Sequence, residues 1–276
     1  MTYQPDITGV RAKIERAKEH VRDLELPISQ FEQLIANGVV AYNEPDTGDR
    51  VFRVKIPYQP PLRWATIIGD AVHNLRSSLD ILVAELVRGK GNPVTRHTGF
   101  PIYNSVDAFT DAFKSGYPAK VEGAPDEAVD LIKATKPYKG GNDALWYIHR
   151  LDIVDKHSLL IAVISRREGT VYDMSHHRVT WDSIHNPSRI AEAWKWWSLE
   201  HFDDYTGPLK EGAVIDRIPA QFRSHVDVDP QFAFRVSFGE NEVVQGQAIL
   251  PALYNYVNFV EGIVEPFLPL FSRDAS

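Results

Sequence analysis

The longest apolar seam of the chain runs through residues 62–87 and places the first constraint on the fold. Its apolar residues recur at intervals of four and three, the spacing that gathers side chains on one side of an α-helix: Ile68, Val72, Leu75, Leu79, Leu82 and Leu86. Gly89, Gly91 and Pro93, which are residues that end helices, follow the seam. We therefore predict one long helix over residues 62–87 with a buried face.

Similar helical spacing occurs towards both ends of the chain. It predicts a helix over residues 7–24, which Pro27 interrupts, and a short continuation over residues 30–36. Further helices are expected over residues 126–134 with Asp126 as N-cap, over residues 143–155, and over residues 252–267 with Pro251 at the first position.

Short β-prone runs fill most of the remaining chain. Residues 39–42 and 51–56 flank turn-forming residues and predict a hairpin. Later strands are expected at residues 159–165, 171–172, 179–181, 213–218 and 232–238. Residues 188–200 are expected to form a short helix or a partly helical loop whose three tryptophans cover the sheet. Because helices and strands are segregated along the chain, we predict an α+β fold.

The predicted architecture is one domain over residues 1–276. An antiparallel helical core would use residues 1–157 and 250–270, which include the terminal helix. An antiparallel β region would use residues 158–249.

Composition narrows the classes of function. The net charge of −7 argues against a basic surface for nucleic acid over the whole protein, although a local basic groove stays compatible with it. The chain has no cysteine, which excludes disulfides, zinc–thiolate sites and cysteine nucleophiles. Neither a signal-peptide pattern nor an apolar run of about 18 residues occurs, so we expect a cytoplasmic protein without a membrane span.

A polar stripe borders the seam of the long predicted helix. Residues three and four apart are neighbours on a helix, so these side chains should share one face: His73, Arg76, Ser77 and Asp80, with Asn74 beside them. Three interpretations compete. The stripe could be a structural hydrogen-bonded network in which Arg76 pairs with Asp80. It could act on a nucleic acid, with Arg76 on a phosphate and His73 moving a proton. It could bind a metal through His73 and Asp80.

A second stripe closes the helix predicted over residues 143–155. Lys156 and His157 suit the negative end of the helix dipole, but Asp152 and Asp155 do not. Two aspartates in the last turn therefore predict specific partners, such as Arg76 or Arg150.

Three segments carry a resemblance to known proteins. They are Gly69–Asp80 with its His-Asn-Leu-Arg core, Phe100-Pro101-Ile102, and Pro137-Tyr138 followed by the Leu-Asp-x-x-Asp-Lys-His ending at His157. In order and motif they resemble a family of uncharacterised bacterial and phage proteins. Arg150 and His157 also stand at a spacing that resembles the HEPN superfamily of helical ribonucleases, although Leu151 follows Arg150 where that pattern prefers a polar residue. The second resemblance implies a dimer that cleaves RNA by using the ribose 2′-hydroxyl.

No Walker A loop, Gly-x-Gly-x-x-Gly, Gly-x-Ser-x-Gly or His-Glu-x-x-His motif occurs. We therefore expect no cofactor and no metal, and treat His176-His177 as incidental. The candidate catalytic residues are His157, Arg150, Arg76, His73 and Asp155.

The remaining polar residues are expected to form a binding or structural cluster: Asn74, Asp80, Asp152 and Lys156. Two long helices would pair antiparallel and bring both stripes together. The leading hypothesis is a metal-independent, HEPN-like endoribonuclease with RNA as partner and a homodimer as assembly. The alternatives are a non-catalytic binding protein with a structural polar cluster, or a His/carboxylate metal-binding helical protein.

Overall fold

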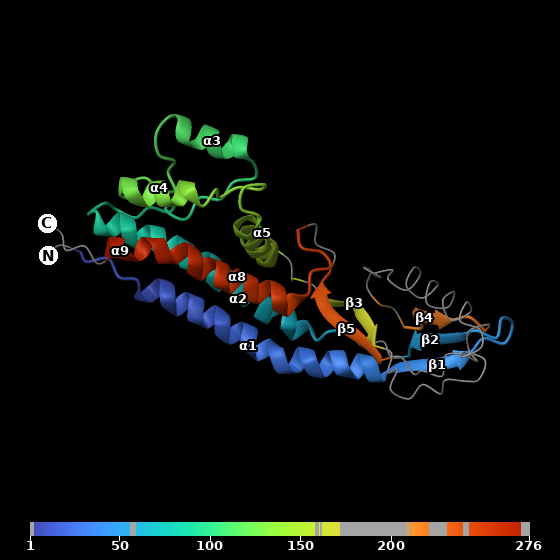
Figure 1. Ribbon diagram of the computed structural model, residues 1–276. Helices are drawn as coiled ribbons and strands as arrows, with labels where there is room; N and C mark the ends of the chain where they lie inside the picture. Colours follow the sequence, from blue (N-terminus) through green and yellow to red (C-terminus); the bar gives the residue numbers. More distant parts are fainter. Residues whose placement is uncertain are drawn as a thin grey trace, which may run out of the picture.

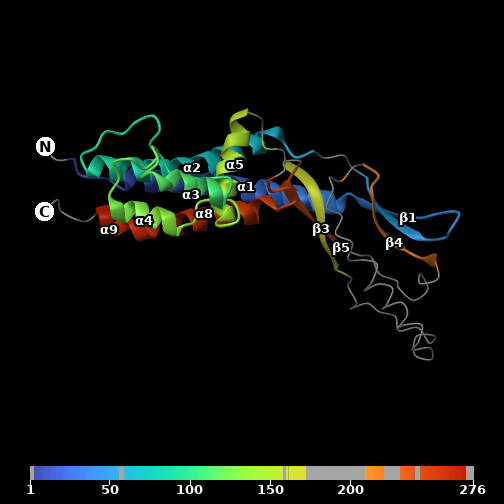
Figure 2. The ribbon, with the colours of Figure 1, turned by 90° about the horizontal axis from the view of Figure 1, so that it is seen from above.

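The computed structural model describes residues 3–55, 59–157, 160, 162–171, 209, 211–220, 231–239 and 243–271. The molecule is elongated, with a bundle of helices at one end and the strands at the other (Figures 1 and 2). The fold is α+β, with an antiparallel helical core, antiparallel sheets and a C-terminal helix, as the segregation of elements along the chain predicted.

Three long helices form the core: α1 (Thr8–Asn37), α2 (Leu62–Gly89) and α8 (Ile249–Val264). Every residue of the predicted seam on α2 is buried, because α1 and α8 both pack against it. The rings of Phe31 and Trp64 meet edge to face, 5.3 Å apart, at the end of the bundle nearest the strands. Near the other end Gly9 lies against Ile81, so α1 and α2 run antiparallel.

The predicted interruption of the first helix at Pro27 is wrong. Helix α1 continues through Pro27 to Asn37. A proline inside a helix loses one backbone hydrogen bond and crowds the preceding turn. Here Leu24 and Ile28 on either side of it are fully buried in the core. Their burial offsets the local cost and keeps the helix in one piece.

Shorter helices cover one side of the bundle: α3 (Val106–Lys114), α4 (Asp126–Ala134) and α5 (Asp143–His157). Helix α3 was not predicted from the sequence, and Pro125 takes the N-cap position of α4 in place of Asp126. Helix α5 crosses α2 steeply (Figures 1 and 2), so the long antiparallel pairing expected for these two helices is not what brings the stripes together. A short 3-10 turn, η3 (Glu265–Phe267), and α9 (Leu268–Phe271) end the described chain.

Two antiparallel sheets extend from the bundle. Strands β1 (Val39–Asn43), β2 (Arg50–Val54) and β4 (Val214–Ile218) form one, in the order β1-β2-β4. Strands β3 (Ala162–Val171) and β5 (Gln231–Phe238) form the other. The predicted hairpin is confirmed, but it joins β4, so the β region is not confined to residues 158–249. The predictions for residues 172, 176–177, 179–181 and 188–200 lie outside the described residues.

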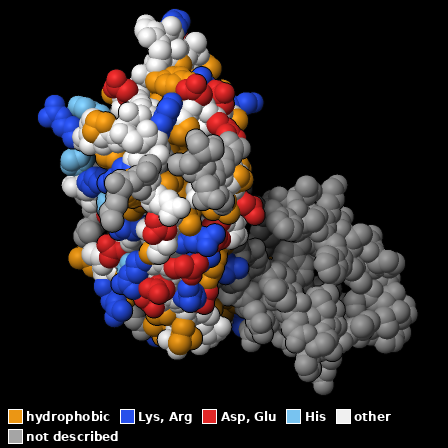
Figure 3. All heavy atoms as spheres, turned by 90° about the vertical axis from the view of Figure 1, so that its left-hand side faces the viewer, with side chains coloured by type: hydrophobic (Ala, Val, Ile, Leu, Met, Phe, Trp, Pro, Cys, Tyr) orange, Lys and Arg blue, Asp and Glu red, His pale blue; other side chains and the backbone are white. Residues whose placement is uncertain are grey.

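No helix within the described part of the chain is long and apolar enough to cross a membrane. Acidic and basic side chains are interspersed on the face in Figure 3, which shows no uniformly basic surface there.

Candidate functional site

The two polar stripes meet where α5 crosses α2. A glycine permits this close approach, because a Cβ atom on Gly69 would overlap the Asp155 carboxylate. One turn further along α2, His73 meets Asp152. Of the predicted meeting between the two stripes, the structure shows the contact of His73 with Asp152, and Asp155 approaches α2 at Gly69.

The imidazole of His73 is held by a buried carboxylate. Its Nδ1 lies 2.7 Å from Oδ1 of Asp152, whose side chain is only 4% exposed, whereas the His73 side chain is 48% exposed. The ammonium of Lys156 donates to the other Asp152 oxygen at 2.6 Å. Asp152 thus has two cationic or potentially cationic partners, and they are His73 and Lys156 rather than the expected Arg76 or Arg150.

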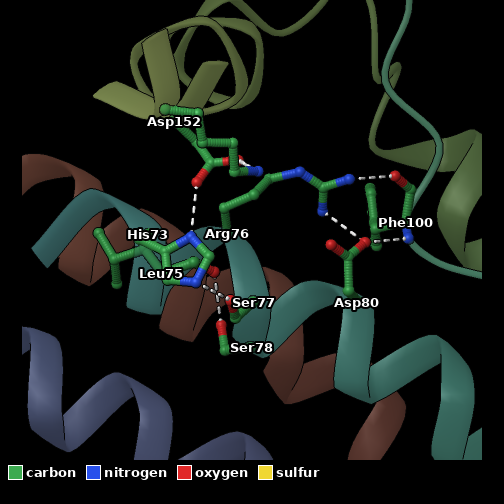
Figure 4. Close-up of polar contacts among 9 residues, drawn as sticks. His73, Leu75, Arg76, Ser77, Ser78, Asp80, Phe100 and Asp152 are labelled. Atoms are coloured by element: carbon green, nitrogen blue, oxygen red, sulfur yellow. Dashed lines mark hydrogen bonds and ion pairs between the residues drawn. The ribbon is translucent and has the colours of Figure 1, made fainter. Parts of the chain in front are cut away.

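The second nitrogen of the His73 ring faces a hydroxyl group. Nε2 lies 3.3 Å from Oγ of Ser77, one helical turn away, at an exposed position (Figure 4). If Asp152 accepts the Nδ1 proton, Nε2 is left as the acceptor. The chain Asp152–His73–hydroxyl then has the order of a base that is oriented by a carboxylate and aimed at an O–H group.

The crossing of α2 and α5 has two sides: the His73 flank, with Asp152 and Asp155, and the Arg76 flank, with Asp80 and His149. Arg76 is buried on its flank. Its side chain is 6% exposed, and its guanidinium donates to the Phe100 carbonyl at 2.8 Å and pairs with Asp80 at 2.8 Å. Asp80 in turn accepts the Phe100 backbone N–H at 2.8 Å (Figure 4). A Cβ atom on Gly99 would lie 2.5 Å from Asp80, so this loop packs tightly onto α2. These contacts agree with the structural interpretation of Arg76 and Asp80.

Asn74 belongs to a different interface. Its amide donates to the Asp70 carbonyl at 2.7 Å and accepts from the Lys13 ammonium at 3.0 Å. It therefore links α2 to α1 and does not contribute to the crossing with α5.

Carboxylates gather on the His73 flank. Burial, followed by the nearby charges of Asp70 and Asp152, raises the pKa of Asp155 above its ordinary value. Asp155 makes no hydrogen bond or ion pair within the described residues, and its carboxylate rests against Gly69. This flank is thus rich in negative charge.

The Arg150–His157 pair points elsewhere. Both residues lie on α5. At about 100° per residue they share a face that lies roughly 140–160° around the helix from Asp152. Among the described residues, no hydrogen bond or ion pair joins Arg150 or His157 to the other candidates. The structure therefore separates this pair from the His73–Asp152 contact.

Two residues outside the predicted set lie near Arg76. His149 sits one turn before Asp152 on α5, and burial, with help from the charges of Arg76 and Lys120, lowers its pKa to about 4. Lys120 is close to Phe100, because its carbonyl accepts the backbone N–H of Gly99 at 3.0 Å. No sequence pattern marks Lys120, which lies in an irregular loop.

The described residues contain no group of three or more His, Asp or Glu side chains arranged to hold a metal ion. His73 and Asp80, the pair considered for a metal, are each engaged with other partners.

Comparison with known proteins gives no further guide: no family model, curated protein or solved structure matches this chain. Both resemblances drawn from the sequence therefore stay predictions.

Proposed function

We propose that the protein is a metal-independent endoribonuclease in which His73 moves the proton. The observation that carries this proposal is the contact of a half-exposed imidazole with a buried carboxylate, 2.7 Å from His73 Nδ1 to Asp152. A buried carboxylate keeps one tautomer and orientation of the ring and stabilises the imidazolium that forms. The outward Nε2 already has a hydroxyl, that of Ser77, within 3.3 Å.

In the proposed reaction, Nε2 of His73 takes the proton from a ribose 2′-hydroxyl. The 2′-oxygen attacks the adjacent phosphorus, the bond from phosphorus to the 5′-oxygen breaks, and that oxygen takes up a proton from solvent. The products are a 2′,3′-cyclic phosphate and a 5′-hydroxyl end. The nucleophile comes from the substrate, so no metal-bound water and no cofactor enters this scheme.

The other candidate residues receive different roles. Lys156 offsets the charge of Asp152, with which it shares a 2.6 Å contact, and so acts through His73. Arg76 and Asp80 are positioning residues, because both are engaged in holding Phe100 to α2. Arg150 and His157 would act only in the HEPN-like manner, on a separate face of α5 and with a second copy of the chain.

The test is cleavage of a short single-stranded RNA by the purified protein in the presence of EDTA. We expect a cyclic-phosphate product, no cleavage of an RNA with 2′-deoxyribose at the scissile position, and a loss of about 10²–10⁴-fold in His73→Ala. Asp152→Asn should also lose activity, since the amide no longer enforces the tautomer.

His97→Ala is the matched control, because His97 is exposed in the loop between α2 and α3. Cleavage that survives in His73→Ala but is lost in His157→Ala or Arg150→Ala would move the active site to the HEPN-like pair. Absence of cleavage by the wild-type protein would refute the proposal.

A second candidate is a non-catalytic binding protein whose polar cluster is structural. The closed set of contacts among Arg76, Asp80 and Phe100 favours it. Its signature would be variants of both flanks that lower stability without changing any RNA cleavage.

A further inference from the structure

The cationic flank of the α2–α5 crossing contains two buried nitrogens that no hydrogen bond satisfies. Within the described residues, these are an Arg76 terminal guanidinium nitrogen (Nη1) and Nδ1 of His149. The Arg76 nitrogen lies 2.8 Å from Asp80, but without the alignment of a hydrogen bond. The Arg76 nitrogen therefore keeps an ionic partner, whereas His149 Nδ1 has no hydrogen-bond partner within the described residues. Buried polar atoms without partners are uncommon in folded proteins, and a bound ion is one explanation for them.

A free ammonium group accompanies the two nitrogens. Lys120 is exposed and makes no hydrogen bond or ion pair within the part of the chain that the structure describes. Partial burial of the ammonium group and the nearby charge of Arg76 lower its pKa, and the nearby charge of Asp80 opposes this shift. The electrostatic neighbours of His149 are Arg76, Lys120, Asp152 and Arg150, of which only Asp152 is acidic. Helix α2, helix α5 and the loop that contains Lys120 thus bring nitrogen groups close enough to influence one another electrostatically.

We propose that Lys120 and His149, backed by Arg76, form a binding subsite for a phosphate group, and specifically for the phosphodiester of the RNA in the proposed function. The inference deepens that function and rests on it for the identity of the ligand. Lysine and arginine nitrogens are the usual protein donors to phosphate oxygens.

The charge distribution along the crossing favours this flank for a phosphate. The His73 flank carries the carboxylates of Asp70, Asp152 and Asp155 beside the Lys156 ammonium, whereas the other flank carries the Asp80 carboxylate beside Arg76 and Lys120. Arg76 lies three residues, roughly 5 Å, from His73 along α2, and His149 lies three residues from Asp152 along α5. A nucleotide can therefore place its phosphate on the cationic flank while its 2′-hydroxyl lies near Nε2 of His73.

Titration of the full chain with inorganic phosphate tests the subsite without any cleavage. The side-chain resonances of His149 are followed by NMR. Because a phosphate anion favours the protonated ring, bound phosphate should raise the pKa of His149 from about 4. Lys120→Gln and His149→Gln should each weaken phosphate binding at least fivefold. Both are mild changes: Lys120 is exposed, and glutamine keeps a polar side chain at position 149.

Lys90→Gln is the charge-matched control, because Lys90 is an exposed lysine beyond the far end of α2. Phosphate that leaves His149 unperturbed, or equal binding by Lys120→Gln and Lys90→Gln, would overturn the proposal. A short RNA and its DNA counterpart serve as further ligands, and competition of both with phosphate is expected.

The two proposals fail separately. Phosphate binding at Lys120 and His149 without RNA cleavage would refute the proposed function and support the subsite. RNA cleavage without phosphate binding would do the reverse.

Discussion

The two flanks of the α2–α5 crossing arise from one continuous stripe on α2, yet they differ in almost every physical property. His73 is half exposed, with one ring nitrogen on buried Asp152 and the other towards solvent. Arg76, less than one turn away, is buried and is engaged with Asp80 and the Phe100 carbonyl. A polar residue at the edge of an apolar seam can therefore be either an accessible reactive group or a buried residue that holds two elements together.

What separates the two outcomes is the element that covers each residue. The loop through Gly99 and Phe100 closes over Arg76, whereas α5 reaches His73 through the Asp152 hydrogen bond and leaves the His73 side chain 48% exposed. Residue type alone therefore does not assign the role. Burial and the number of satisfied hydrogen bonds do so.

The largest expected effect is on stability, through Arg76→Ala. We expect a loss of about 3 kcal/mol in the free energy of unfolding, because removal of one partner breaks a buried ion pair and leaves the Phe100 carbonyl without its donor. His73→Ala should cost less than about 1 kcal/mol, since its ring is half exposed. Urea unfolding followed by circular dichroism measures both. Equal losses would remove the distinction between the flanks.

Acid should destabilise the Arg76 flank through His149. Its folded pKa of about 4 lies below the ordinary value of 6.5, so the unfolded chain binds the proton more readily. The contribution of neutral His149 to the free energy of unfolding is therefore fully present above about pH 6.5 and is lost as the pH falls through 4. The loss is about 2 kcal/mol after allowance for the partly exposed ring. Urea unfolding at pH 7 and pH 4.5 measures the change. His149→Gln should show a smaller fall than the wild-type protein, and an identical fall would contradict this assignment.

The close approach of α5 to α2 can be tested at Gly69. Gly69→Ala should cost about 1–2 kcal/mol, because the new methyl group overlaps the Asp155 carboxylate. Asp155→Ala in the same chain should recover most of that loss, since it removes the overlapping atoms. A thermal-melt double-mutant cycle measures the coupling, and additive effects would mean that the two positions do not touch.

The smallest effect is expected from Asp155→Asn. The raised pKa of Asp155 means that its ionised form is disfavoured in the folded state. Its contribution therefore lowers stability once the pH rises above the ordinary carboxyl value of 3.8. Asparagine should raise the melting temperature slightly at pH 7 and leave it unchanged near pH 3. A lower melting temperature at pH 7 would show that the carboxylate has a stabilising partner.

The helical core could be predicted because its signals are local. The spacing of Ile68, Leu75 and Leu82 identified α2, and the pair Arg76–Asp80 follows from their four-residue separation. The predicted helix break at Pro27 was wrong. The sequence shows the cost of a proline inside a helix, but it does not show that Leu24 and Ile28 beside it are buried in the core. Helix α3 was missed, and none of its residues is buried.

By itself, the sequence determined which residues share a helix face, because 3.6 residues per turn is a local rule that holds wherever a helix forms. Only the tertiary structure decided that His73 meets Asp152, 79 residues later in the chain, and that Lys120 comes near Arg76. Such meetings depend on the angle at which α5 crosses α2 and on a glycine that lets the two helices come close. Crossing geometry results from the packing of the whole core, so no short stretch of residues encodes it.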